Sequence, residues 1–217
     1  MIPALDEEAG VVDAIRSVRQ AAELIVVDGG SRDRTRELAA AEGALVVESR
    51  PGRGVQLACG ARQATGEWLV FLHADTRLEP GWAEALAALP EDVVGGAFRF
   101  AIDSDRPAYR LIEAGAAWRC RLLGLPYGDQ GIFVRRVVYG ITGGFRPFPL
   151  MEDVEFVRRL RAAGRLAFPP VRALTCARRW EHYGVLRATL RNWWLFALYS
   201  AGWPPQRLAQ LYGQRHS

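Results

Sequence analysis

The sequence LIVVDGGS, residues Leu24–Ser31, indicates the fold class most clearly. Its apolar, mostly β-branched first half is typical of a buried strand, and Asp28, Gly29 and Gly30 end that strand in a turn. The glycines let the backbone approach a ligand, and the Asp28 carboxylate can accept hydrogen bonds from a nucleotide base or ribose. The alternative is a tight turn that Asp28 caps.

Strand and helix patterns alternate on both sides of this stretch. We expect strands at 2–5, 24–27, 44–47 and 68–72, and helices at 7–22, from Ser31 or Asp33 to 41, and at 55–64. This order predicts a parallel sheet with helices on both faces, and such sheets bind ligands at the carboxyl ends of their strands. Asp28 and Asp75 both follow such an end.

The pattern changes after Pro90. We expect a long strand at 93–102, a helix at 109–123, a strand at 131–135, a helix at 152–163, a short strand near Leu166, and one or two helices over 185–212 broken at 202–205. The predicted fold class is therefore α/β, a mixed but mainly parallel sheet flanked by helices, with a helical C-terminal tail. We expect one domain over residues 1–180 and a helical extension over 181–217 that packs on it.

Composition narrows the class of protein. The chain has 217 residues, half of them hydrophobic and 24% charged, which suits one globular core and excludes a disordered or collagen-like chain. Without an apolar run of the ~20 residues that a membrane span needs, and without a signal-peptide pattern, a cytoplasmic location is expected. Cys59, Cys120 and Cys176 have no disulfide-framework or zinc-site spacing.

All 28 basic residues are arginine, and the net charge is +4. Arginine favours a phosphate-bearing partner, although a compositional bias of the genome gives the same result. Of the possible partners, nucleic acid is not expected. In the loop RPGRG, residues 50–54, Arg53 and free backbone N–H groups at a helix start can meet a phosphate. The dinucleotide fingerprint fails there because Leu57 replaces its third glycine, and a solvated basic loop is the alternative.

Two acidic segments are candidates for chemistry. Asp75 follows an apolar strand and suits a divalent cation that also binds substrate phosphates, with His73 as a second ligand. For His73 the alternative is a hydrogen-bonded histidine at the end of a strand. Glu152 and Asp153 open a helix, where Asp153 can act as a general base, although acids are common in first helical turns for electrostatic reasons alone.

Taken together, these segments resemble the family 2 glycosyltransferases with the Rossmann-like GT-A fold. The resemblance covers residues 1–180 and rests on IPALDEE (2–8), VVDGGSRDRT (26–35), GEWLVFLHAD (66–75), the pair Glu152-Asp153 and Arg178-Arg179-Trp180. FLHADT (71–76) and GDQGIFVRR (128–136) further resemble a small bacterial branch labelled arsenosugar-biosynthesis-like.

The resemblance implies a role for each matching residue. Asp153 would be the catalytic base, and Asp75, with His73, would hold Mg²⁺ or Mn²⁺ against the diphosphate. The nucleotide-sugar would be bound by Pro3, Leu5, Glu7, Asp28, Arg53, Asp75, Arg179 and Trp180, and the acceptor by Asp129, Gln130 and Glu152. The implied reaction is metal-dependent, inverting transfer of a sugar from a nucleotide-diphosphate sugar, with UDP expected, to a hydroxyl of a small-molecule or lipid acceptor.

Three residues depart from the family pattern: His73 replaces the first acid of the DxD motif, Gly29 replaces the second acid of the DD pair, and Cys176 replaces the glutamine of QxxRW. Two other functions stay open, a nucleotidyltransferase and a non-catalytic module that binds a nucleotide or a membrane surface. The apolar stretch 193–199 predicts a packed helix or a homodimer contact, with peripheral membrane contact as the alternative.

Overall fold

The computed structural model describes residues 1–213, apart from the side chains of Arg179 and Leu186. Its first half alternates strands and helices as the sequence predicts. The strands are β1 (Ile2–Ala4), β2 (Ile25–Asp28), β3 (Leu45–Glu48) and β4 (Trp68–Phe71), and the helices are α1 (Val11–Ser17), α2 (Thr35–Ala41) and α3 (Arg53–Gln63).

Two sheets, β1-β2-β3 and a four-stranded one that begins with β4, are joined through Met1 and together form what we call the large sheet. β1 pairs with β2 and β2 with β3, all in parallel. Met1 connects β1 to β4, because its amino group donates to the Val70 carbonyl at 2.7 Å and its carbonyl accepts from the Leu72 N–H at 3.0 Å. Beyond β4 come antiparallel β8 (Ile132–Arg135), then β6 (Val93–Ala97) and β9 (Arg165–Ala167). The predicted mixed α/β class is confirmed.

A smaller sheet lies beside the large sheet. Its central strand, β10 (Arg172–Cys176), runs antiparallel to β5 (Thr76–Leu78) and parallel to β7 (Arg99–Asp103). At its carboxyl end the Cys176 N–H donates to the Asp75 carbonyl at 3.0 Å. The small sheet thereby fixes the backbone of Asp75, which lies in the turn after β4.

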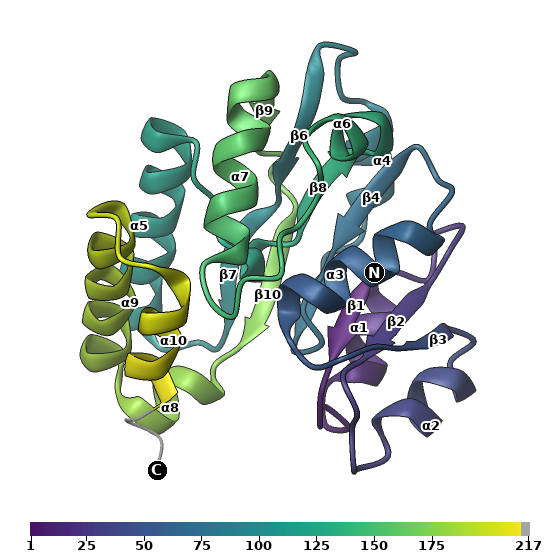
Figure 1. Cartoon of the computed structure of the whole chain (residues 1–217), viewed down its shortest axis with the longest axis horizontal. Coiled ribbons are helices and arrows are strands. Elements are labelled where there is room, and N and C mark those ends of the chain that lie inside the picture. Colours follow the sequence, from purple (N-terminus) through teal and green to yellow (C-terminus); the bar gives the residue numbers. More distant parts are fainter. Residues whose placement is uncertain (214–217) are drawn as a thin grey trace.

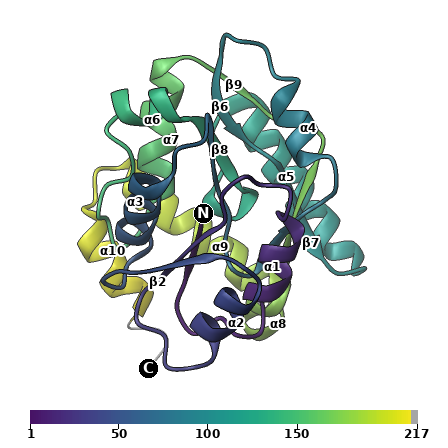
Figure 2. The ribbon, with the colours of Figure 1, turned by 90° about the vertical axis from the view of Figure 1, so that its right-hand side faces the viewer.

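Helices cover both faces of the large sheet (Figures 1 and 2). The core on one face joins Leu57 of α3 and Phe156 of α7 (Glu152–Ala163) to Phe71. The opposite core joins Ile15 of α1 and Trp82, the first residue of α4 (Trp82–Ala87), to the sheet. The remaining helices are α5 (Pro107–Leu123), the 3₁₀ turn η1 (Gly128–Gln130), α6 (Arg136–Ile141), α8 (Arg178–Tyr183), α9 (Val185–Ser200) and α10 (Pro205–Gly213).

The structure corrects two predicted elements. The helix expected at 7–22 spans only Val11–Ser17, because the Glu7 N–H is held by the Thr35 hydroxyl at 2.8 Å in a loop. The strand expected at 93–102 is interrupted at Phe98, whose N–H donates to the Gln130 carbonyl at 3.0 Å. The chain there leaves the large sheet as β6 and joins the small one as β7.

The C-terminal helices contact the rest of the molecule. Ala188 of α9 is buried with Tyr109 of α5, and the Phe196 ring lies 6.2 Å from the Tyr127 ring. The division into residues 1–180 and 181–217 stays a prediction. No helix within residues 1–213 combines the length and the apolar character that a bilayer span needs.

Candidate active site

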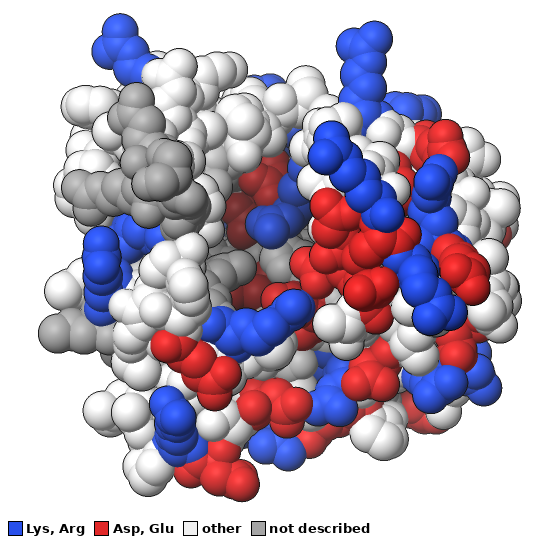
Figure 3. All heavy atoms as spheres, turned by 90° about the horizontal axis from the view of Figure 1, so that it is seen from below, with Lys and Arg blue, Asp and Glu red and all other residues white. Residues whose placement is uncertain are grey.

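A cleft of about 570 Å³ opens at the carboxyl ends of β1 and β4. Seen from that side, the molecule is hollowed, with acidic and basic side chains in the walls (Figure 3). The predicted site residues that line this cleft are Pro3, Leu5, Glu7, Arg53, His73, Asp75, Asp129, Glu152 and Asp153. Residues from five separate motifs therefore meet in one place.

Asp75 reaches the cleft because β4 ends at Phe71 and the chain turns before β5 begins. Besides the backbone bond from β10, its carboxylate accepts a hydrogen bond from the Thr76 hydroxyl at 3.3 Å. Gly10, at the amino end of α1, packs closely against this turn. A Cβ on Gly10 would lie only 2.7 Å from the Ala74 carbonyl oxygen. Packing around the turn thus fixes the position of Asp75.

Asp153 enters the cleft from the first turn of α7. One of its carboxylate oxygens accepts from the Val154 N–H at 2.7 Å, and the other accepts from the Gly128 N–H at 2.7 Å. A Cβ on Gly128 would lie 2.8 Å from Nε2 of His73 and 3.3 Å from Oδ2 of Asp153. Gly128 therefore lies between the histidine that follows β4 and the carboxylate of α7, and its lack of a side chain allows the close approach.

The cleft concentrates negative charge around one arginine. Nη1 of Arg53 lies 3.4 Å from Oε1 of the buried Glu152. Burial acts to lower the pKa of Arg53, but the nearby carboxylates of Glu152, Asp153, Asp75 and Asp129 outweigh it and raise that pKa. Arg53 thus remains a cation. It can pair with the nearby carboxylates or with the phosphate of an incoming ligand.

Two acidic residues in the cleft are held closer to their neutral forms. Burial, followed by repulsion from Asp75, raises the pKa of Glu7, although Arg178 at 3.2 Å from its carboxylate opposes this. Burial also raises the pKa of Glu152, against the attraction of Arg53. A positive charge introduced near Asp75 would favour the ionised form of Glu7.

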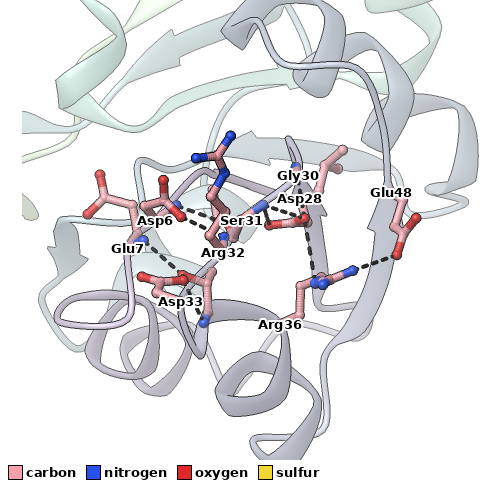
Figure 4. Close-up of polar contacts among 12 residues, drawn as sticks. Asp6, Glu7, Asp28, Gly30, Ser31, Arg32, Asp33, Arg36 and Glu48 are labelled. Atoms are coloured by element: carbon pink, nitrogen blue, oxygen red, sulfur yellow. Dashed lines mark hydrogen bonds and ion pairs between the residues drawn. The ribbon is translucent and has the colours of Figure 1, made fainter.

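Several predicted site residues lie elsewhere. Asp28 is fully buried at the end of β2, beside Ala4, and its carboxylate accepts from Gly30 N–H at 2.9 Å and from Ser31 N–H at 3.0 Å (Figure 4). Its carboxylate therefore organises its own loop, and its role in base binding stays a prediction.

Gln130 and Trp180 are also away from the cleft lining. The Gln130 side chain is buried, with its carbonyl oxygen accepting from Arg119 at 2.8 Å. Trp180 is buried among apolar residues, its ring 6.0 Å from that of Phe100. The side chain of Arg179 lies outside the described residues.

Residues 1–149 match the family model described as glycosyl transferase family 2. The chain belongs to glycosyl transferase family 2. It is 34% identical to an undecaprenyl-phosphate 4-deoxy-4-formamido-L-arabinose transferase of Pseudomonas paraeruginosa, over 44% of this chain and 33% of that one. It is 33% identical to an uncharacterised glycosyltransferase of Mycobacterium bovis, over 41% of each chain. The matched regions span only a third to two fifths of these curated relatives.

Solved structures share the fold of this family 2 chain. Glucosyl-3-phosphoglycerate synthase of Mycobacterium tuberculosis, in complex with Mg²⁺ and UDP, matches with a TM-score of 0.60 and 23% identity over 80% of this chain and 69% of that one. The same enzyme with Mn²⁺, UDP and phosphoglyceric acid matches with a TM-score of 0.58 and 23% identity over 77% and 66%. The predicted family and fold are thereby confirmed, whereas the arsenosugar-like branch stays a prediction.

The cleft residues of this family 2 chain fit a cation that shares its coordination with a substrate. Among the described residues, no three His, Cys, Asp or Glu side chains gather closely enough to hold an ion by themselves. Mg²⁺ commonly takes only one or two protein carboxylates and completes its shell with substrate phosphates and water. Asp75, set in a cleft beside Glu7 and Arg53, provides this kind of donor.

Some cleft residues were not predicted as site residues. Asn192 and Leu195 of α9 and Ala209 and Tyr212 of α10 line the cleft, as does Tyr127. The spacing of 192 and 195 places these two on one face of a helix, but periodicity alone does not reveal which surface that face covers. Arg178 was also missed as a site residue, although it forms part of the quoted Arg-Arg-Trp motif.

Proposed function

We propose that this protein moves a sugar from a nucleotide-diphosphate sugar, with UDP as the nucleotide, to an acceptor hydroxyl, with inversion at the anomeric carbon. The observation that carries the proposal is that Asp75 and Asp153, far apart in the sequence, line the same cleft together with Pro3, Leu5 and Glu7. Family membership supports glycosyl transfer, and the UDP complexes of the fold neighbours support the choice of nucleotide.

The donor side of the reaction falls to residues near β1 and β4. Asp75, with His73 as a second ligand, would hold Mg²⁺ or Mn²⁺ beside the diphosphate. The ion would supply positive charge against the charge that develops on the departing diphosphate. Arg53, which faces the same space, would pair with a phosphate oxygen when the nucleotide enters.

The acceptor side falls to Asp153. Its carboxylate would take the proton of the acceptor hydroxyl while that oxygen forms a bond to the anomeric carbon and the bond from that carbon to the diphosphate breaks. A positioned general base of this kind contributes about 10²- to 10⁴-fold to the rate. The Gly128 N–H, which already donates to Asp153 at 2.7 Å, would hold the carboxylate in place.

The test is the substitution Asp153→Asn. We expect it to lower transfer from UDP-sugars by about 10²- to 10⁴-fold while UDP binding stays near that of the wild type, because it removes the proton acceptor but little volume. A screen of UDP- and GDP-sugars with Mn²⁺, read out as nucleotide release and glycoside formation, measures this. Asp92→Asn, on an exposed carboxylate paired with Arg165, is the matched control. Normal turnover by Asp153→Asn would remove Asp153 from the base role.

The same screen separates the alternatives. A nucleotidyltransferase would release pyrophosphate, whereas glycosyl transfer releases UDP. A non-catalytic module would bind UDP without metal dependence and form no product.

We also propose that the outer face of α9 contacts an anionic membrane surface. Leu190, Trp193 and Trp194 are exposed there, Trp193 by 59%, and their spacing puts them on one face of the helix. Contiguous exposed apolar patches mark contacts with a membrane or another protein. The sequence 185–213 contains no Asp or Glu, and the exposed Arg187 and Arg207 give it a positive charge. Tryptophan with arginine suits the headgroup level of a bilayer. A homodimer contact through the same face is the competing outcome.

A further inference from the structure

The turn that carries Gly128 is held from behind by one buried amide. Gln130, the last residue of η1, has a side chain that is only 2% exposed. Its carbonyl oxygen accepts from the Tyr127 N–H at 3.1 Å and from Nη2 of Arg119 at 2.8 Å. Its amide nitrogen donates to the Phe98 carbonyl at 3.2 Å. The amide therefore joins the start of η1 to α5 and to the point where the chain passes from the large sheet to the small one.

These partners suit a glutamine amide better than a carboxylate or an apolar group. The Arg119 guanidinium and the Tyr127 N–H are donors only, and the Phe98 carbonyl is an acceptor only. The amide matches both kinds of partner at once. Sγ of Cys120 lies 3.4 Å from the amide oxygen and 3.3 Å from the amide nitrogen, so it contacts both ends. A methionine at position 130, with a similar length, would take this partner away from every one of these groups.

Arg119 holds the same segment through two further contacts. Its Nε donates to the Leu125 carbonyl at 2.8 Å, and its guanidinium carbon lies 3.6 Å from the centre of the Tyr127 ring. The planar fork thus reaches both ends of the segment 125–130 while it stacks on the middle. A lysine would keep the positive charge but could not make these contacts together.

The other side of this segment faces the cleft. Tyr127, Gly128 and Asp129 line the cleft, and the Gly128 N–H donates to Asp153 at 2.7 Å. A shift of the turn would move this donor away from the carboxylate. It would also change the spacing between Asp153 and His73, because Gly128 lies between them.

We infer that Gln130 and Arg119 are positioning residues for sugar transfer, which hold η1 so that the Gly128 N–H orients the Asp153 carboxylate. This inference rests on the proposed function, in which Asp153 accepts the proton of the acceptor hydroxyl. Gln130 then acts from behind the turn and not on the acceptor itself. Loss of either residue should lower the rate of transfer and leave donor binding unchanged.

Hydrogen exchange of the Gly128 amide tests the contact without any substrate. In ¹⁵N-resolved NMR we expect this amide to exchange at least about tenfold faster in Gln130→Met and in Arg119→Lys than in the wild type, because the turn opens more often. The Gly29 N–H, which donates to the Ala4 carbonyl at 2.9 Å, is the internal reference and should exchange alike in all three chains.

Release of UDP from UDP-glucose with Mn²⁺ tests the effect on the rate. We expect kcat to fall about 10- to 100-fold in both variants, as for a displacement of ~1 Å at a reacting group, and the KM for UDP-glucose to stay the same. Leu86→Ala, which opens a cavity in the core on the opposite face of the large sheet, is the control for lost stability. It should lower the midpoint of denaturation and leave kcat unchanged.

The double variant with Asp153→Asn tests whether Gln130 acts through Asp153. Residues that act as a unit are not additive, so Gln130→Met should lower kcat no further once Asp153 is replaced. Circular dichroism shows whether each variant is folded. If Gln130→Met is not, Arg119→Lys decides.

Exchange of Gly128 at the wild-type rate in either folded variant overturns the inference, and so does a wild-type kcat. A loss of kcat from Gln130→Met that is equally large in the Asp153→Asn chain also overturns it, because Gln130 would then act elsewhere. Failure of the proposed function gives a different result. Asp153→Asn then releases UDP as fast as the wild type, or the wild type releases none, while Gly128 exchange still decides whether Gln130 and Arg119 hold the turn.

Discussion

Gly128 is the residue on which the geometry of the site depends most closely. Its N–H holds Asp153, and the space that a side chain would occupy is taken by His73 and Asp153. A substitution there acts on the two halves of the site together, although Gly128 itself has no chemical function.

We predict that Gly128→Ala lowers transfer by about 10- to 100-fold, because a displacement of ~1 Å at a reacting group has effects of this size. Its effect on unfolding should be about 1–3 kcal/mol of destabilisation, typical of overpacking. Steady-state kinetics and denaturant unfolding measure the two effects.

Gly115→Ala is the matched control for this substitution. Gly115 lies within α5, with open space around the added Cβ, so the change should stabilise the fold by about 0.5–1 kcal/mol and leave transfer intact. Equal activity of the Gly128→Ala variant and the wild type would show that the close approach is not needed for catalysis.

The sequence identifies site residues whose place at the end of a strand or at the start of a helix brings them to the cleft. Asp75 and Asp153 follow a strand end and open a helix, and both reach the cleft as expected. Asp28 has the same signal, yet the Gly30 and Ser31 N–H groups use its carboxylate. Gln130 is likewise held by Arg119. Which partner a polar side chain chooses depends on the packing of distant segments, and local patterns do not record it.

At the scale of elements, Glu42 connects the first two helices. Its carboxylate, just after α2, lies 2.6 Å from Arg16 of α1 and 2.5 Å from Arg19. Hydrogen bonds from Arg16, and then from Arg19, lower the pKa of Glu42 from its ordinary 4.5 to about 2.

This lowered pKa predicts an acid-sensitive contribution to stability. Between pH 4.5 and 2 the unfolded chain binds a proton at Glu42 that the folded chain does not, so the free energy of unfolding falls as the pH falls through this range. Above pH 4.5 the contribution is fully present. Denaturant unfolding at a series of pH values measures it.

Glu42→Gln should make the free energy of unfolding depend less on pH between 4.5 and 2. Replacing Arg16 and Arg19 together by glutamine should reduce this pH dependence to a similar extent. An unchanged slope in both variants would mean that the ion pair does not persist in solution.

The elements themselves were predictable where the pattern is local. The strands around LIVVDGGS and the long helices α3, α5 and α7 have clear periodicity, and their positions agree with expectation to within a few residues. β5 and β10 were missed because they are short and are stabilised by pairing with each other across almost a hundred residues. The break at Phe98 was missed for a similar reason, since the chain there exchanges one sheet for another.

At the scale of the whole molecule, the apolar surface extends beyond α9. Leu111, Trp118 and Leu122 are exposed along one face of α5, which contacts α9 (Figure 1). α9, which lines the cleft through Asn192 and Leu195, and the neighbouring α5 therefore both present large apolar side chains to the outside.

We predict that the chain floats with vesicles containing anionic phospholipid, and that Trp193→Ser with Trp194→Ser reduces the floating fraction several-fold. Val137→Ser with Ile141→Ser removes exposed apolar residues from α6 and should leave flotation unchanged. If the wild type does not float and light scattering gives twice the chain mass, the surface is instead a contact between two copies.

The division of labour in the cleft is tested by calorimetric titration of UDP, with and without Mn²⁺, into the wild type and the variants Asp75→Asn and Asp153→Asn. We predict that Asp75→Asn loses the gain in UDP affinity that Mn²⁺ gives the wild type, whereas Asp153→Asn keeps it. Equal loss in both variants, or full retention of the gain by Asp75→Asn, would contradict the division of the cleft into a metal-binding donor side and a proton-accepting side.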